Sequence, residues 1–179
     1  MSAQSVRAFQ FIVGFVAVFG LVATQTQRSV VAGQLMPKES RPQAPEFRKE
    51  TSAGGVADLA GLRGKVVLLN FWATWCGPCK AEIPWFIEFA KRYQSAGFEV
   101  LGVSMDDDGW DSVRPFIAAR NISFPIVLGD DRLASRYGGV ESLPETILID
   151  RSGKIAFKHV GLVSRQDLEQ QISRLLQEK

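Results

Sequence analysis

The residues of this sequence that are best suited to chemistry are two cysteines in the motif Cys76-Gly77-Pro78-Cys79. They are the only two cysteines among the 179 residues, so neither can staple distant parts of a fold together. Two thiols at this spacing can form a disulfide bond with one another and exchange it with another thiol or disulfide. The motif therefore predicts two-electron thiol–disulfide exchange without a bound cofactor.

The motif lies between a predicted strand and a predicted helix. Residues 65–72 form a continuous β-branched and apolar run, which is typical of a strand covered on both faces, and residues 81–93 have helical character. Cys76 would stand at the amino terminus of that helix, where unpaired N–H groups and the helix dipole stabilise an anion. At such positions the pKa of a cysteine can fall from about 8.5 to about 3.5–7.5. We therefore expect Cys76 to attack a substrate disulfide as a thiolate, and Cys79 to resolve the mixed disulfide and leave Cys76–Cys79 oxidised.

Metal and haem chemistry have less support. The alternative for a bare cysteine pair is half a metal site or two inert buried thiols, but a structural zinc ion needs four ligands and the sequence adds only His159. A haem-attachment motif needs histidine where Lys80 stands. The acidic run at residues 106–108 could imitate a metal-binding loop, although adjacent carboxylates before a helix are usually solvated. We expect no metal and no cofactor, and we expect a packing or surface role for His159.

The amino-terminal segment predicts a membrane anchor. Residues 9–23 are almost wholly apolar and follow Arg7, which favours a cytoplasmic amino terminus with the rest of the chain outside. The apolar run is near the limit between a signal-peptide core and a spanning helix, so a cleaved signal peptide remains the alternative. We predict an anchor or signal peptide over residues 1–27, a flexible linker over residues 28–44 with scattered prolines and no periodicity, and one folded domain over residues 45–179.

The rest of the domain alternates strands and helices. Strands are predicted over residues 98–104, 126–128, 146–150 and 155–160, the last two as an antiparallel hairpin, and a helix over residues 111–120. Ser164 is a good cap for a closing helix with Leu168, Ile172, Leu175 and Leu176 on its apolar stripe. This order predicts the α/β class, with a central mixed β-sheet flanked by helices.

A resemblance to a known family supports this interpretation. Residues 70–79, NFWATWCGPC, resemble the thioredoxin superfamily, and Glu82 with Pro84 is similar to its TlpA/ResA/CcmG-like, membrane-facing branch. The resemblance covers residues 45–179. It implies a thioredoxin-like fold with Cys76 as nucleophile, Cys79 as resolving cysteine and a cis Pro144 beside them. The chain departs from the pattern at residues 140–143, where relatives often carry glycine nearer the proline, and this leaves the choice of substrate open.

Several neighbouring residues are candidates for the site. Glu82 lies one helical turn after Cys79 and could move a proton to or from that thiol if burial raises its pKa, whereas a solvated surface glutamate is the alternative. Asn70 stands where cytoplasmic thioredoxins carry a buried aspartate, so proton transfer would fall to Glu82 or water. A cis Pro144 can leave the backbone of the preceding residue free to pair with an extended substrate; a trans proline that opens a strand is the alternative. We expect the substrate surface to comprise Trp75, Gly77, Pro78, Leu143 and Pro144, with Trp72 in the core.

These features predict a reductase of protein disulfides outside the cytoplasmic membrane. The resemblance implies exported substrates such as apocytochrome c thiols, and a membrane thiol donor of the CcdA/DsbD-like kind. The alternatives are a disulfide oxidase or isomerase, a thiol peroxidase, and a non-catalytic binding module. The peroxidase has less support, because Ala73 stands where peroxiredoxins place threonine. A net charge of only +2 disfavours nucleic acid as a partner.

Overall fold

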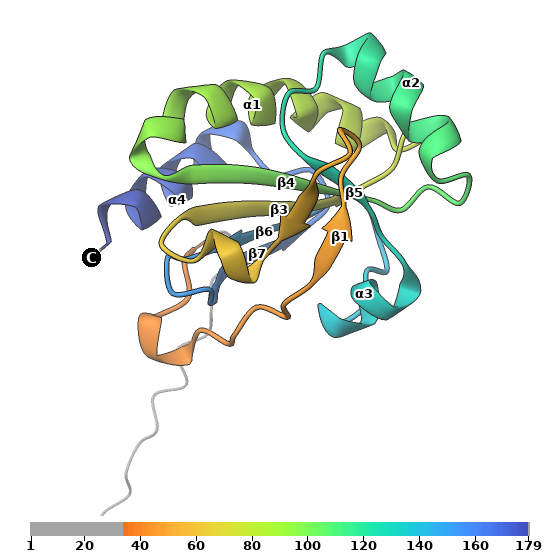
Figure 1. The fold of residues 1–179 in the computed structure, drawn as a ribbon. Helices are drawn as coiled ribbons and strands as arrows, with labels where there is room; N and C mark the ends of the chain where they lie inside the picture. The colour runs from red at the N-terminus through yellow and green to blue at the C-terminus, as the bar shows by residue number, and fades with distance from the viewer. Residues whose placement is uncertain (1–33, 179) are drawn as a thin grey trace, which may run out of the picture.

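A mixed five-stranded sheet forms the centre of the molecule. The computed structural model describes residues 34–178, and in it the strands lie in the order β5-β4-β3-β6-β7 (Figure 1). The β3–β4 and β4–β5 pairs are parallel, whereas β3–β6 and β6–β7 are antiparallel. The strand bounds are β3 (Val66–Trp72), β4 (Phe98–Ser104), β5 (Ile126–Leu128), β6 (Glu145–Ile149) and β7 (Ile155–Val160). The predicted strands are thus confirmed, two of them with bounds shifted by one residue.

Helices cover both faces of this sheet. In the view of Figure 1, α1 (Gly77–Tyr93) and α2 (Trp110–Arg120) lie above it, α4 (Arg165–Gln177) lies behind α1 and packs on the same core, and α3 (Asp131–Arg136) lies below. Short 3-10 turns occur at η1 (Lys38–Ser40), η2 (Ala60–Leu62) and η3 (Gln94–Ala96). Helix α1 begins four residues earlier than the pattern at 81–93 indicated, because Pro78 occupies a first-turn position where its missing N–H costs no hydrogen bond. The α/β class and the flanked mixed sheet are confirmed.

Strand β3 is buried along its whole length, as its apolar run predicted. Its side chains alternate between two cores: Leu68 and Trp72 belong to the core under α1, α2 and α4, and Leu69 and Phe71 belong to the core on the α3 face. Because β3 lies between β4 and β6, both of its backbone edges are also hydrogen-bonded. The strand therefore brings its carboxyl end, just before the cysteine motif, to a fixed place.

The closing helix α4 forms as its cap and stripe predicted. The amide of Asp167 donates to Ser164 Oγ at 3.4 Å, and Leu168, Ile172 and Leu175 are buried. The apolar stripe holds α4 against the sheet beside α1.

Two short strands and one short α-helix were not predicted. The hairpin of β1 (Arg48–Glu50) and β2 (Val56–Asp58) has a mixed exposure pattern, and α3 has only six residues. Such short segments carry too few apolar positions to show a period, and they form because the rest of the domain packs against them.

The predicted linker overlaps a part of the chain that packs on the domain. Met36 N donates to Ala156 O at 2.7 Å, Ile155 N to Pro42 O at 2.8 Å, and Ala44 N to Gly153 O at 2.9 Å. Two of these bonds join the first two residues of β7, which is the last strand of the sheet, and the third joins the turn before it. Residues 36–44 are therefore part of the domain, whose first residue was predicted at 45. The prediction missed them because their hydrogen-bond partners lie on a strand edge distant in the sequence, which leaves no pattern within the linker.

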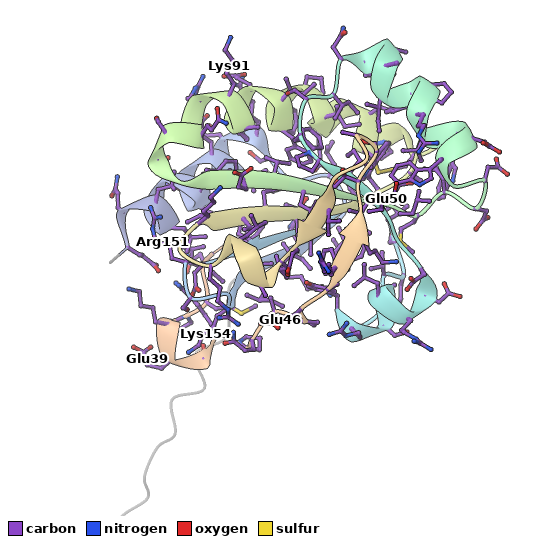
Figure 2. All side chains as sticks on the ribbon, in the orientation of Figure 1. Glu39, Glu46, Glu50, Lys91, Arg151 and Lys154 are labelled. Atoms are coloured by element: carbon purple, nitrogen blue, oxygen red, sulfur yellow. A yellow bond between two sulfur atoms is a disulfide. The ribbon has the colours of Figure 1, made fainter. Side chains whose placement is uncertain are left out.

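A buried arginine also holds this segment in place. Arg41 is 6% exposed, and its guanidinium donates to Asp150 Oδ2 at 3.0 Å and to both carboxylate oxygens of Glu178 at 2.7 and 2.8 Å. The hydrogen bond from Arg41 keeps the pKa of Glu178 below its ordinary value. Figure 2 labels Glu39, Arg151 and Lys154, which lie on this side of the molecule.

The predicted anchor or signal peptide at residues 1–27 lies outside the described residues. Within residues 34–178, no helix combines the length and the apolar character needed to cross a bilayer.

Candidate active site

The two cysteines form a disulfide bond at the start of α1. Cys76 is the N-cap of the helix, and its Sγ accepts a hydrogen bond from the backbone N–H of Cys79 at 3.2 Å. Cys76 is 4% exposed and Cys79 only 1%, so the first sulfur is the one closer to the solvent. The strand-to-helix junction predicted from the sequence therefore holds Cys76 where helix N–H groups can stabilise a thiolate.

Asp106, two residues after the end of β4, holds the turn before the disulfide. Asp106 accepts hydrogen bonds from Thr74 N at 3.0 Å and from Ser104 Oγ at 2.8 Å. The prediction of a solvated acidic run is therefore wrong for Asp106, which is half-buried, while Asp107 and Asp108 are exposed. The register Trp72↔Ser104 places Asp106 beside this turn, and a sequence pattern cannot show that pairing.

Glu82 lies in the interior, not on the helix surface. Its exposed fraction is 0%, and its Oε1 accepts a hydrogen bond from Val163 N at 2.9 Å, whereas Oε2 has no hydrogen-bond partner within residues 34–178. Burial raises the pKa of Glu82 to about 7, although the hydrogen bond from Val163 acts in the opposite direction. The carboxyl group can thus be found in either protonation state near neutral pH.

Asn70 lies in the same core and cannot titrate. It is 3% exposed, and its Nδ2 donates to Thr146 Oγ1 at 3.0 Å and to Glu145 O at 3.4 Å. These bonds tie β3 to β6. Because Asn70 cannot exchange a proton, the buried acid within two helical turns of the disulfide is Glu82 on α1.

The Leu143–Pro144 peptide bond is cis, as predicted. The register Phe71↔Glu145 places this bond at the same end of the sheet as the disulfide, because β3 ends there and β6 begins there. Pro144 O accepts a hydrogen bond from Gly161 N at 2.7 Å. Pro144 is buried and Leu143 is half-buried.

The predicted substrate residues of the cysteine motif are accessible. Gly77 and Pro78 are exposed, and Trp75 is 68% exposed, whereas Trp72 is 1% exposed and packs on Phe116 with ring centroids 5.2 Å apart. The predicted division of the two tryptophans between surface and core is therefore confirmed.

The structure adds residues that sequence reasoning missed. Val160 and Leu162 are each 51% exposed, and Val163 provides the only hydrogen-bond donor to Glu82 found in the described part of the chain. They stand at and just after the end of β7, at the same end of the sheet as Trp75. An apolar run between a strand and a helix cap, where polar turn residues are usual, was the signal that could have revealed them.

The raised pKa of Glu82 predicts a pH-dependent stability. In the unfolded chain this group loses its proton near 4.5, but in the folded protein it does so at about 7, so folding binds a proton between these values. The free energy of unfolding of the oxidised protein should therefore fall by about 3 kcal/mol as the pH rises across this window. Urea unfolding at a series of pH values should show this slope in the wild type and not in Glu82→Gln.

Glu88→Gln is the matched control, because Glu88 lies on the same helix and its carboxylate forms ion pairs at the surface with Arg92 and Arg165. Glu88→Gln should keep the pH dependence of the wild type. If Glu82→Gln kept it as well, Glu82 would not be the group that binds the proton.

Solved structures of other proteins share this fold. A "thiol:disulfide interchange protein, thioredoxin family protein" from Chlorobium tepidum superposes with a TM-score of 0.70 and 29% identity, over 76% of this chain and 97% of that protein. A secreted thiol-disulfide isomerase from Corynebacterium glutamicum superposes with a TM-score of 0.74 and 25% identity, over 80% of this chain and 91% of that protein. The predicted thioredoxin-like fold is thereby confirmed.

Sequence comparison leads to the same group. Residues 41–158 match the AhpC/TSA family. The thiol-disulfide oxidoreductase ResA of Geobacillus thermodenitrificans is 36% identical over 133 residues, which span 74% of this chain and 75% of that protein. The chain therefore belongs to the AhpC/TSA family of thioredoxin-like proteins and, within it, to the ResA-like thiol-disulfide oxidoreductases.

Proposed function

We propose that this oxidoreductase works as a reductase of protein disulfides, with Cys76 as the attacking residue. The observation that carries the proposal is the placement of Cys76 at the N-cap of α1, with the more deeply buried Cys79 one turn behind it. In the reduced enzyme, the Cys76 thiolate attacks one sulfur of a substrate disulfide, and the substrate S–S bond breaks as the mixed disulfide forms. The released substrate thiolate takes up a proton.

Resolution returns the enzyme to the disulfide form. Cys79 loses its proton and attacks Cys76 Sγ, which releases the second substrate thiol and closes the Cys76–Cys79 bond. Two electrons pass from the enzyme dithiol to the substrate. A thiol donor must then reduce the enzyme again, and we propose a membrane protein of the CcdA/DsbD-like kind.

Glu82 is proposed to accept the proton of Cys79. It lies three residues beyond Cys79 on α1, and its Oε2 has no competing hydrogen bond within the described residues. A pKa of about 7 makes the carboxylate a proton acceptor at neutral pH that can also return the proton in the reverse step.

The surface around the disulfide suits a polypeptide more than a small molecule. The described part of the chain has four exposed large apolar side chains, and three of them, Trp75, Val160 and Leu162, lie at the disulfide end. Exposed Gly77 and Pro78 carry little side chain that would hinder the approach of a substrate backbone, and the backbone of Leu143, before the cis Pro144, makes no hydrogen bond within the described residues. We propose exported proteins as substrates, among them apocytochrome c, whose cysteine pair the enzyme would reduce from a disulfide to thiols.

The site of action is proposed to be the outer side of the cytoplasmic membrane. An amino-terminal single-pass anchor would hold the domain there. A reductase is required in such a compartment because thiols become oxidised there.

Trapping of the mixed disulfide tests the chemistry. In Cys79→Ala the resolving thiol is missing, so a substrate protein should remain bound to Cys76 through a disulfide bond that dithiothreitol releases. Non-reducing electrophoresis of cells that express the full chain measures this adduct. Cys76→Ala is the control and should trap nothing; equal adducts in both variants, or none in either, would contradict the assignment and favour a binding module.

The direction of the reaction is tested by the reduction potential. A reductase of this kind should have a value near that of thioredoxin, about −270 mV, because the Cys76–Cys79 pair must give electrons to substrate disulfides. Equilibration with glutathione or dithiothreitol buffers measures it. A potential above about −150 mV would show an oxidase instead.

The proton role of Glu82 is tested by the pH profile of a single turnover. With the pre-reduced wild type, the rate of protein-disulfide reduction should rise as the pH passes through about 7. In Glu82→Gln that step should disappear, and the rate at pH 8 should fall about 10²-fold. An unchanged profile in Glu82→Gln would exclude Glu82 as the acceptor, and Glu88→Gln should behave as the wild type.

A further inference from the structure

An ion pair with a buried carboxylate lies next to the cis proline, on the sheet face opposite to the disulfide helix. Glu145 follows Pro144 in the chain and its side chain is 1% exposed, whereas Lys158 on β7 is 29% exposed. Their Nζ and Oε1 atoms are 3.0 Å apart. Because Ile147 pairs with Lys158 and Glu145 pairs with Val160, these side chains project from the same face of the sheet.

The same ammonium group also reaches the other end of the loop before the proline. Lys158 Nζ donates a hydrogen bond to Tyr137 O at 2.8 Å. Tyr137 is the C-cap of α3, and its ring packs edge-on against Phe71 with centroids 5.4 Å apart. Its hydroxyl donates to Pro45 O at 2.8 Å. One lysine therefore connects a well-anchored residue before the loop to the residue that follows Pro144.

The loop between these two points has few bonds of its own. Gly138 and Gly139 turn the chain with φ values of 92° and 86°. Within the described part of the structure, residues 140–143 make no backbone hydrogen bond, and their attachment consists of the packing of Val140 and Leu143 on the cores. The position of Leu143 at the disulfide end of the sheet thus depends on how firmly the two ends of the loop are held.

We propose that Lys158 is a positioning residue for substrate recognition, which holds both ends of the loop at residues 138–143 through Glu145 and the carbonyl of Tyr137. The inference rests on the proposed function, since Leu143 and Pro144 are taken as part of the substrate surface. Lys158 lies on the face opposite to α1, so it acts through the loop and not on the sulfur atoms.

The change that tests this role is Lys158→Met, which keeps the length and apolar stem of the side chain and removes the ammonium group. Lys154→Met is the matched control: Lys154 belongs to the same hairpin, and no side-chain bond of it to the loop occurs in residues 34–178. Figure 2 shows Lys154 on the side of the molecule that carries Glu39 and Glu46.

Two substrates separate positioning from chemistry. Insulin provides a protein disulfide, with dithiothreitol as electron donor to the full-length protein. The compound 5,5′-dithiobis(2-nitrobenzoic acid) provides a small disulfide that needs no extended contact with the loop; because dithiothreitol reduces it directly, its rate is measured in a single turnover with pre-reduced protein from which dithiothreitol has been removed. Lys158→Met should raise KM for insulin about tenfold with an unchanged kcat, since the loss of an interaction made equally in ground and transition states has this signature. The rate with the small disulfide and the reduction potential should stay as in the wild type.

A second variant separates the loss of the bond to Tyr137 O from destabilisation of the fold. Lys158→Met leaves the Glu145 carboxyl group buried without its cation, and burial already raises its pKa while the ion pair with Lys158 lowers it. Glu145→Gln combined with Lys158→Met removes the buried charge but does not restore the bond to Tyr137 O. This double variant should therefore keep the raised KM for insulin.

The outcomes are distinct. A wild-type KM in the double variant, or an equal loss with insulin and the small disulfide, would overturn the role of Lys158. If the wild type reduces the small disulfide and not insulin, the proposed function fails. In that case amide hydrogen exchange over residues 138–143 still decides the inference: exchange should be faster in Lys158→Met than in Lys154→Met, and equal exchange would overturn it.

Discussion

Strand β3 is hydrogen-bonded on both edges and buried on both faces, and the remainder of the site takes its position from this strand. Its last residue, Trp72, is packed in the core, so the four residues that follow can turn only at the end of the sheet before α1 begins. Cys76 is thereby held at the helix terminus by burial of the strand before it and of the helix after it. A thiolate at this place needs no further charged partner, because helix N–H groups already face it.

The disulfide end combines two opposed environments. Outward lie Trp75, Val160 and Leu162, which offer apolar surface to a partner. Inward lies Glu82, whose carboxyl group is held by one backbone N–H from the segment after β7. The same segment binds Pro144 O through Gly161 N. The proposed proton acceptor and the proposed substrate surface are therefore both hydrogen-bonded to the segment after β7. A change in the position of one should alter the position of the other.

At the end of the sheet opposite to the disulfide, an early segment of the chain packs on the outermost strand. There, residues 36–44 are hydrogen-bonded to the start of β7 and to the turn before it, and Arg41 pairs with two carboxylates in a largely buried site. A buried charge is stable only when it is paired and hydrogen-bonded, which favours one geometry for this segment. The chain thus enters the domain at the end of the sheet where β3 begins, remote from the disulfide at the end where β3 finishes.

The sequence alone determined the features that depend on neighbours in the chain: the apolar run of β3, the cysteine motif at a helix start, the capped stripe of α4 and the α/β order of elements. These are local periodicities and spacings, and their physical cause acts within a few residues. The tertiary structure decided what depends on residues distant in the chain. Val163 lies 81 positions from Glu82, and only folding shows that the glutamate is buried. Likewise, Lys158 donates a hydrogen bond to Tyr137 O because the strand and the helix that carry them pack together. Contacts between residues so distant in the chain leave no periodic pattern in the sequence.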